Sequence, residues 1–368
     1  MVTLPIAPKL PTPAQLLEGI TLPSGWALIE RLNQAPGSSG SNFGTGYKAQ
    51  RTIDGKIEHA FVKAMDLARA FGTPDPFAEM FKLTAESEFE RRALEHCKDR
   101  RLSRLIQLIS WEYINRDTTG NPLNQVLCLI MEVGDGDIRK QLTRTGALPT
   151  SAILHVLEDT ALGMAQLHRS GIAHQDVKPS NVISMTDMST AAKRLFKVAD
   201  LGRIVRKGIA GPYDAYPWPG DGNYQPPERW YSYVPPQWPD AREASDAYML
   251  GSLACFLFCG VPMQPLLGRE IPAAMLPGKW TGGYSDSLIQ ILRSKQYSVL
   301  ATTVAPTINE KVRGGVIEII KELIEPDPLK RGDKRARTQT GAPGLDRFQS
   351  RFKQLRVHAA IDEKFNQP

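Results

Sequence analysis

Short apolar segments separated by turn residues fill the first third of the chain. They alternate with stretches rich in glycine, serine or charge, a pattern typical of strands in an antiparallel sheet. One turn carries the pair Asp54-Gly55, which is a strong signal for a tight hairpin. The pattern predicts strands at 26–29, 47–49, 57–63, 106–113 and 126–131.

Longer segments with apolar residues at helical spacing accompany and follow these strands. Residues 77–97 predict a helix of several turns, and 151–170 predict another, with Thr150 or Ser151 as its cap. The stretch 248–258 is apolar on all sides, which predicts a helix buried at the centre of its domain. A β-rich half followed by a helical half indicates an α+β class with a cleft between two lobes.

The composition is ordinary for a globular protein. The chain has 368 residues, 42% hydrophobic and 23% charged, and can bury a sizeable core in one or two domains. Its longest apolar run, 248–263, is shorter than the ~20 residues that span a bilayer. The N-terminus also lacks the basic start and apolar segment of a signal peptide. We therefore expect no transmembrane segment and a cytoplasmic location.

The two ends of the chain differ from the middle. Residues 1–22 are rich in proline and predict an arm or linker, whereas 336–368 form a basic tail. The tail could be an amphipathic helix for a membrane surface, a nucleic acid or an acidic partner. It could instead pack as a terminal helix on its own domain, which is the interpretation we favour. Its apolar residues at helical spacing are Leu345, Phe348, Phe352 and Leu355.

The segment 174–181, with the sequence HQDVKPSN, carries the most specific chemical signal. It places the acid Asp176, the cation Lys178 and the amide Asn181 at the spacing that phosphoryl transfer needs. An aspartate that accepts a hydroxyl proton, followed five residues later by an asparagine that binds Mg²⁺, is the core of a protein-kinase catalytic loop.

Four further stretches occur in the order that a phosphate-transfer site requires. A glycine-rich stretch at 37–49 can bring backbone N–H groups close to phosphates, and 60–63 (AFVK) ends in a lysine that can pair with them. The apolar segment 129–134 ends at a glycine, and 198–202 reads VADLG. Together with the catalytic segment, these stretches resemble the eukaryotic-type (Hanks-type) serine/threonine protein kinases over most of the chain.

This resemblance implies a bilobal protein-kinase-like fold, with a small β-rich lobe at 23–133 and a larger helical lobe at 134–335. It also implies ATP and Mg²⁺ as cofactors, and a protein substrate with a serine or threonine hydroxyl. The hinge between the lobes would hold adenine through its backbone. The nucleotide-binding residues implied in this way are Gly40, Ser41, Phe43, Gly44, Lys63, Met131, Glu132, Gly134 and Asp137.

The resemblance assigns roles to the charged residues as well. Asp200 and Asn181 would bind Mg²⁺, which prefers oxygen ligands. Glu86 and Glu88 are alternatives to Glu90 as the partner of the strand lysine. The catalytic residues implied are Asp176, Lys178, Lys63 and Glu90.

Three charged residues outside the catalytic segment support the same family. Glu228, in the sequence YQPPE, and Arg331 match a glutamate and an arginine that form a buried ion pair in these kinases. Neither charge is tolerated in a protein interior without the other. Asp246 begins the apolar helix and matches the aspartate that braces the backbone of the catalytic loop.

Gln175 and Asp221 depart from the family pattern. Gln175 replaces the arginine that normally meets a phosphorylated residue of the activation segment, which makes the chain a non-RD type. Because 203–228 contains no serine or threonine, we predict that Ser/Thr phosphorylation of this segment does not switch activity. Asp221 stands in place of a threonine, and a carboxylate close to Asp176 would raise the pKa of one of them unless Lys178 lies between.

The function predicted from these residues is an ATP- and Mg²⁺-dependent serine/threonine protein kinase. The alternative is a pseudokinase, a nucleotide-binding scaffold with little transfer activity, which the irregular glycine-rich stretch, Gln175 and Asp221 motivate. Phosphorylation of a small molecule is a third alternative. It is disfavoured by Lys178-Pro179 and by the match to the buried ion pair.

Overall fold

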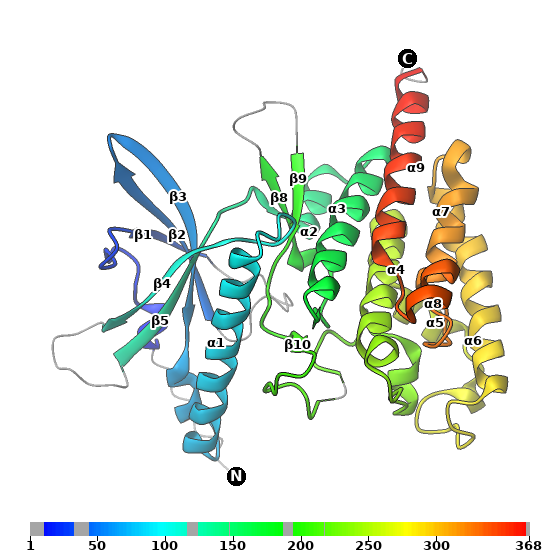
Figure 1. The fold of residues 1–368 in the computed structure, drawn as a ribbon, viewed down its shortest axis with the longest axis horizontal. Coiled ribbons are helices and arrows are strands. Elements are labelled where there is room, and N and C mark those ends of the chain that lie inside the picture. Colours follow the sequence, from blue (N-terminus) through cyan, green and yellow to red (C-terminus); the bar gives the residue numbers. More distant parts are fainter. Residues whose placement is uncertain are drawn as a thin grey trace, which may run out of the picture. The chain divides into compact units, whose positions relative to one another are not determined.

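The computed structural model describes residues 11–32, 44–115, 124–146, 148–186, 194–216 and 218–365. The chain divides into two compact units. The first contains the residues up to 99 together with 107–133, and the second contains 100–106 and the residues from 134 onward. The first unit is built on a sheet and the second is mainly helical, which confirms the α+β class (Figure 1).

A five-stranded antiparallel sheet with the order β1-β2-β3-β5-β4 forms the centre of the first unit. The hairpin between its second and third strands turns at Asp54 and Gly55, both with positive φ, as the sequence predicts. This turn keeps a continuous register over ten residue pairs. The strands are β1 (Ala27–Leu32), β2 (Gly44–Ile53), β3 (Lys56–Met65), β4 (Leu108–Asn115) and β5 (Gln125–Met131).

The described part of the proline-rich arm belongs to the core of this unit. Its short helical stretch is the 3₁₀ turn η1 (Pro13–Gln15), and Leu17 is fully buried in the cluster that also contains Trp26 and Tyr47. The Tyr47 hydroxyl donates to the Ala14 carbonyl oxygen at 2.7 Å and accepts from the Leu17 N–H at 3.2 Å. The arm therefore packs against the sheet through both apolar contacts and a buried hydroxyl.

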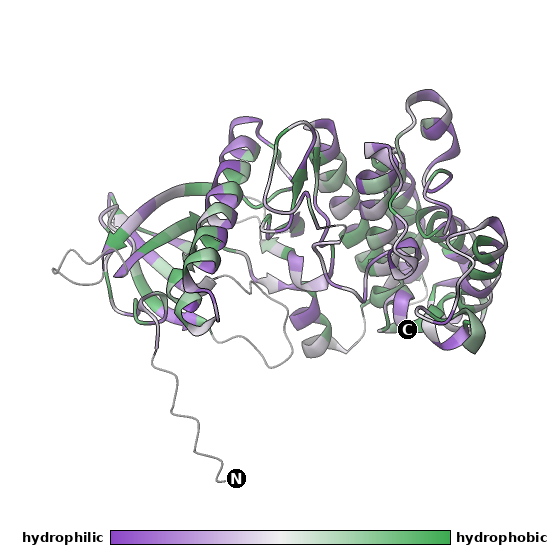
Figure 2. Ribbon diagram, turned by 90° about the horizontal axis from the view of Figure 1, so that it is seen from below, coloured by the Kyte–Doolittle hydropathy of each residue, from purple (hydrophilic) through white to green (hydrophobic). Residues whose placement is uncertain are grey.

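One long helix, α1 (Pro76–Asp99), packs alongside the sheet after the 3₁₀ segment η2 (Leu67–Gly72). Its buried face mixes apolar residues such as Leu83 and Leu94 with the polar residues Glu86, Ser87 and Glu90, and Figure 2 shows hydrophilic and hydrophobic residues interspersed along the helices. The Lys98 ammonium donates to the Ile109 carbonyl oxygen, and the Trp111 indole N–H donates to Glu95, both at 2.7 Å. These contacts tie the C-terminal half of the helix to β4.

The second unit consists of helices with two small antiparallel β structures. The strands are β6 (Gly136–Asp137), β8 (Val182–Thr186) and β9 (Arg194–Val198) in one sheet, and β7 (Ile172–Ala173) with β10 (Val205–Arg206) in a ribbon. The helices are α2 (Ile138–Thr145), α3 (Thr150–Arg169), α4 (Ala244–Cys259), α5 (Met263–Glu270), α6 (Asp286–Val299), α7 (Glu310–Leu323), α8 (Lys334–Thr340) and α9 (Leu345–Phe365).

Helix α4 is the core helix of this unit, as its all-round apolar pattern predicts. Every residue from Ala244 to Cys255 is buried. Gly251 permits close packing, because a Cβ at this position would lie 2.6 Å from the Ile324 side chain. Within the described ranges no single helix is long and apolar enough to cross a membrane, although one bent pair, Pro239–Cys259 with Met263–Glu270, satisfies length and composition together.

The basic tail forms α9, which packs along α3 (Figure 1). Phe348 and Phe352 are fully buried. Arg351 pairs with Glu322 and Arg356 with Glu158, each at 2.7 Å. The tail therefore has the packed arrangement that the sequence favours, and its arginines, which include Arg337 and Arg347, are paired with acids of the same unit.

The predicted cap of α3 is wrong. Pro149 holds the N-cap position, and Thr150 is the first helical residue. The Thr150 hydroxyl accepts from the Asn309 N–H at 3.3 Å, and the Ser151 N–H donates to Glu363 at 3.0 Å. Both polar residues therefore fasten the start of α3 to the neighbouring helices, a role that local sequence does not reveal.

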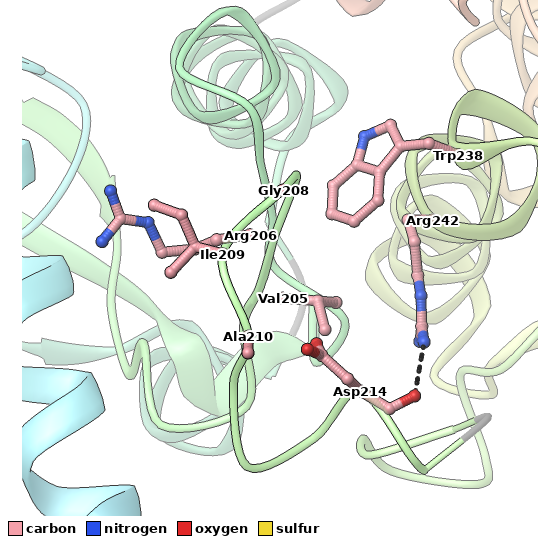
Figure 3. A pocket seen from close by; sticks show the side chains of 8 residues that line it. All are labelled: Val205, Arg206, Gly208, Ile209, Ala210, Asp214, Trp238 and Arg242. Carbon is pink, nitrogen blue, oxygen red and sulfur yellow. Dashed lines mark hydrogen bonds between the residues drawn. The ribbon is translucent and has the colours of Figure 1, made fainter.

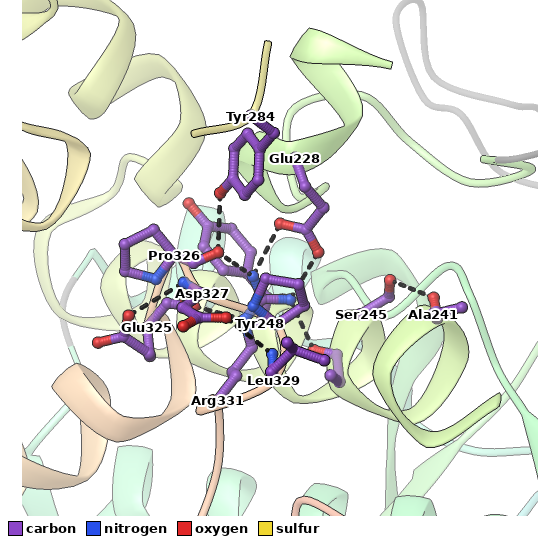
Figure 4. A network of polar contacts seen from close by, with 12 residues as sticks. Glu228, Ala241, Ser245, Tyr248, Tyr284, Glu325, Pro326, Asp327, Leu329 and Arg331 are labelled. Atoms are coloured by element: carbon purple, nitrogen blue, oxygen red, sulfur yellow. Dashed lines mark hydrogen bonds and ion pairs between the residues drawn. The ribbon is translucent and has the colours of Figure 1, made fainter. Parts of the chain in front are cut away.

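Glu228 and Arg331 form a buried ion pair (Figure 4). The two guanidinium N–H groups lie 2.8 and 2.7 Å from the two carboxylate oxygens. The remaining donors of Arg331 reach the carbonyl oxygens of Ala244, Glu325 and Pro326. All five guanidinium donors therefore have acceptors, which offsets the cost of burying the charge.

We predict that Glu228→Gln lowers the free energy of unfolding by about 3–5 kcal/mol, because it leaves the Arg331 charge buried without its counter-ion. Urea denaturation measures the change. Glu318→Gln is the control, since it removes an exposed partner of Lys321 and should change stability by about 0.5 kcal/mol or less. Equal effects of the two substitutions would contradict the structural role of the buried pair.

Candidate active site

Lys63 and Glu90 form a buried ion pair in the first unit. The Lys63 ammonium lies 2.7 and 2.9 Å from the two carboxylate oxygens, and each side chain is 4% exposed. Lys63 lies in β3 between β2 and β5, whereas Glu90 lies in α1. Of the alternatives considered from the sequence, Glu88 pairs instead with arginines of its own helix.

Only part of the predicted nucleotide-binding stretch can be placed. Gly40, Ser41 and Phe43 lie outside the described residues. Gly44 begins β2 opposite Met65, and a Cβ there would lie 2.9 Å from a backbone oxygen of β3. A glycine at this position therefore allows β2 and β3 to lie close together.

The predicted hinge residues lie at the end of β5 and just beyond it. In the first unit, Met131 is buried and Glu132 is occupied twice: its N–H donates to the Gln107 carbonyl oxygen, and its carboxylate accepts from the Gln107 N–H at 2.7 Å. In the second unit, a Cβ on Gly134 would lie 2.4 Å from Ile183. Asp137 caps α2 by accepting from the Lys140 N–H at 2.9 Å.

The catalytic segment brings Asp176, Lys178 and Asn181 together in the second unit. The Lys178 ammonium lies 2.9 Å from Asp176 Oδ2. The Asn181 amide donates to the Asp176 carbonyl oxygen at 2.8 Å and to Oδ2 at 3.2 Å. The N–H of Asp221 donates to the other carboxylate oxygen, Oδ1, at 2.8 Å. Three donors therefore fix the orientation of this carboxylate.

Burial raises the pKa of Asp176 above its ordinary value. The positive charge of Lys178 opposes this rise, and the negative charge of Asp200 adds to it. The Lys178 ammonium also lies 4.0 Å from the Asp221 carboxylate, so this cation is within reach of both acids. The result is a carboxylate that is oriented as a hydrogen-bond acceptor and whose affinity for a proton is raised.

A second aspartate, Asp246 in α4, holds the backbone of the catalytic segment. Its two oxygens accept from the N–H groups of His174 and Gln175, each at 2.8 Å, from the Gln175 amide at 3.0 Å, and from His168 at 2.9 Å. Burial opposes ionisation of Asp246, but the bonds from His168 and the loop outweigh it and lower the pKa of Asp246. The predicted bracing role is confirmed.

The backbone stretches that carry the two predicted metal ligands, Asn181 and Asp200, are neighbours, since the N–H of Ala199, the residue before Asp200, donates to the Asn181 carbonyl oxygen. The bonds from its amide nitrogen to Asp176 fix the Asn181 side chain, and its oxygen remains an acceptor that Ser180 also contacts. Among the described residues no group of three or more His, Cys, Asp or Glu side chains is placed to hold a metal. The side chains of Asn181 and Asp200 offer oxygen atoms, the type of ligand that Mg²⁺ prefers together with phosphates and water.

Sequence reasoning missed the residues that surround Gln175. Its amide oxygen accepts from Arg229 at 3.2 Å and from Arg242 at 3.4 Å, and its nitrogen donates to the Arg242 carbonyl oxygen at 2.9 Å. Burial lowers the pKa of Arg229 to about 9. The sequence does place Arg229 next to Glu228 and Arg242 four residues before Asp246. It does not reveal that both arginine side chains point toward Gln175, because that depends on the tertiary fold.

A cavity of about 350 Å³ lies beside this cluster (Figure 3). Val205 and Trp238 form an apolar part of its wall, and Arg242, in the helical turn that leads into α4, reaches the Asp214 carbonyl oxygen at 3.5 Å. The Asp214 carboxylate also attracts Arg242 electrostatically. The arginine beside Gln175 therefore already has an acid of its own unit nearby.

Comparison with known proteins places these observations in a family. Residues 78–336 match the model of the protein kinase domain. Over 133 residues, 36% of this chain, it is 30% identical to serine/threonine-protein kinase PknL of Mycobacterium tuberculosis, and over 143 residues, 38% of the chain, 29% identical to PknA of Corynebacterium glutamicum. Over 226 residues, 57% of the chain, it is 20% identical to Wee1-like protein kinase 2 of Gallus gallus.

These matches cover 30%, 28% and 34% of the respective relatives, so the chain spans about a third of the length of the curated proteins it matches. The domain match, in contrast, covers more than half of this chain. It includes the Lys-paired glutamate, the catalytic segment and the buried ion pair described above. The chain therefore belongs to the protein kinase family, and within it to the Hanks type that its motifs predicted.

Proposed function

We propose that the protein transfers the γ-phosphoryl group of ATP to serine or threonine hydroxyls of protein substrates. The observation that carries this proposal is the geometry of Asp176, Lys178 and Asn181, in which one carboxylate is oriented by three donors. The names of the bacterial relatives, which are serine/threonine-protein kinases, support the choice of acceptor. Because such a reaction consumes ATP, the proposal includes a cytoplasmic location.

The proposed transfer moves one proton and one phosphoryl group. The Asp176 carboxylate accepts the proton of the substrate hydroxyl, whose oxygen forms a bond to the γ-phosphorus. The bond from that phosphorus to its bridging oxygen breaks, and the electron pair leaves with ADP. Lys178 and Lys63 stabilise negative charge on the phosphates, and Glu90 holds Lys63 in position. The raised pKa of Asp176 suits a group that must take up a proton.

Asn181 and Asp200 would hold Mg²⁺ in this proposal, and the metal, when bound, neutralises charge on the phosphates. The backbone of 131–134 would hold adenine, and Asp137 would reach the ribose. Gly40, Ser41, Phe43 and Gly44 would supply the loop that approaches the phosphates. These nucleotide-binding roles rest on the match of the motifs to the family.

Asp176→Asn removes the proposed base, and we predict a loss of about 10²–10⁴-fold in kcat. Lys63→Ala should lower kcat/KM by a comparable factor, because it removes a charge that stabilises the transferring group. Transfer of labelled phosphate to a protein substrate measures both. Glu310→Gln, at an exposed position remote from the site in sequence, is the control with unchanged activity. Transfer that survives both site substitutions would refute the assignment.

Asp200→Asn tests the metal site. We predict a fall of about 100-fold in activity, together with a higher Mg²⁺ concentration for half-maximal rate, because one of two protein oxygen ligands loses its charge. Titration of activity with Mg²⁺, and of nucleotide binding with and without Mg²⁺, measures the effect. An unaltered Mg²⁺ dependence in this variant would contradict the site.

We also infer that the activation segment works without Ser/Thr phosphorylation. The Gln175 amide already has hydrogen-bond partners on both its oxygen and its nitrogen, so no phosphate is needed to satisfy it. Arg242, which lies beside it, is drawn to Asp214 of the same segment. The carbonyl oxygen of Asp214, together with the negative charge of its side chain, thus supports the loop where other kinases depend on an added phosphate.

Treatment of the purified protein with a broad phosphatase should therefore change its rate by less than about twofold, since no charge-assisted contact to phosphate would be lost. Replacing Tyr213, Tyr216 and Tyr224 one at a time by phenylalanine extends the test to the only phosphorylatable side chains in 203–228. Mass spectrometry before and after treatment confirms the loss of phosphate. A phosphosite that the activity requires would overturn the inference.

The pseudokinase alternative has one specific observation in its favour. The Asp221 carboxylate lies 4.0 Å from the Lys178 ammonium and draws that cation partly away from the transferring group. ATP binding without transfer to any protein substrate would favour this alternative. The intact Lys63–Glu90 pair and the oriented Asp176 carboxylate favour the active enzyme.

A further inference from the structure

Asp221 is pinned against the catalytic segment by its backbone. Its N–H donates to Asp176 Oδ1, and Gly220 before it packs so closely that a Cβ would lie 2.0 Å from the Gln175 carbonyl oxygen. The Gln225 amide also donates to the Gly220 carbonyl oxygen at 2.6 Å. The position of residue 221 therefore does not depend on the chemistry of its side chain.

The two oxygens of the Asp221 carboxylate face different neighbours. Oδ1 accepts from the N–H of Asn223 at 3.0 Å and from its side-chain amide at 3.2 Å. Oδ2 lies 4.0 Å from the Lys178 ammonium, whose nearer partner is Asp176 at 2.9 Å. Of the Asp221 side chain 15% is exposed, so part of it reaches solvent.

The charged groups around Asp176 carry a net negative charge, which is unfavourable for the proposed reaction. Asp176 and Asp221 both face the ammonium of Lys178, so these three groups together carry one net negative charge. The transferring phosphoryl group is itself negative, and a second carboxylate opposes its approach. A neutral threonine at 221 would not add this charge. Further positive charge close to Asp221 would therefore favour the reaction when the acceptor hydroxyl is in place.

We propose that Asp221 is a specificity residue that selects substrates with an arginine or lysine immediately next to the acceptor serine or threonine. The basic side chain would pair with the carboxylate at its accessible edge, and arginine would do so best because of its planar fork of donors. The pair would neutralise the added charge only in the correct complex. This inference rests on the proposed kinase function and names the substrate class of the same site.

The test uses the full chain and a set of peptides that share one serine acceptor. At each position from two before to two after the serine, arginine is compared with citrulline, which keeps the shape and removes the charge. We expect kcat/KM at one adjacent position to be at least about tenfold higher for arginine in the wild type. Asp221→Asn keeps the backbone bond and an oxygen for Asn223, and should reduce this preference to about threefold or less.

In Asp221→Asn the loss should fall on the arginine peptide, while the citrulline peptide reacts as fast as before or faster. A merely structural role of Asp221 would slow both peptides alike. Glu310→Gln is the charge-matched control and should keep the full preference. The inference is overturned if the wild type does not distinguish arginine from citrulline, if Asp221→Asn keeps the preference, or if it changes all peptides equally.

If Asp221→Asn does not fold, the salt dependence of the wild-type enzyme tests the inference. Its preference for arginine should weaken as salt is raised, because the pair lies at the accessible edge of the site. A preference that does not respond to salt would count against a charge contact. Failure of the underlying function is distinguished by the absence of transfer to every peptide and to a generic basic protein. Transfer without charge preference rejects only the inference about Asp221.

Discussion

The buried carboxylate of Asp246 is the interaction on which the second unit's chemistry depends. It sits in a helix that is covered on all sides, where a charge without partners would be very costly. Four donors satisfy it, and three of them come from His174 and Gln175 of the catalytic segment. The cost of leaving this charge unsatisfied therefore forces the loop backbone into one arrangement.

That arrangement includes a strained residue. Gln175 has φ of +63°, a conformation that is unfavourable for residues other than glycine and persists only where the surroundings over-determine it. Its N–H and amide are bound to Asp246, its side-chain oxygen to two arginines, and its carbonyl oxygen lies against Gly220. Because Gly220 precedes Asp221, the same backbone contact that packs the loop also delivers the N–H that orients Asp176. Bracing, strain and the catalytic carboxylate thus form one continuous network.

The match to family motifs located the two buried ion pairs. It implied a partner for Lys63, with Glu86 and Glu88 as alternatives to Glu90, and it implied the pair Glu228–Arg331. The cost of burying a lone charge explains why each partner is needed. Sequence reasoning failed where a residue's role depends on distant segments. Thr150 and Ser151 have the chemistry of caps but bind Asn309 and Glu363, which lie 159 and 212 residues further along the chain. Arg229 and Arg242 likewise acquire their meaning only from the fold that turns both toward Gln175.

The two departures from the family pattern act on the same charge balance. Gln175, in place of an arginine, leaves one cation fewer beside the activation segment, and we infer that the segment therefore needs no added phosphate. Replacing threonine by Asp221 adds an anion beside Asp176, and with it a demand for an added cation. Both changes make the surroundings of the catalytic segment more negative. In the function that we propose, a positively charged substrate neutralises this site, and a phosphorylated activation segment does not.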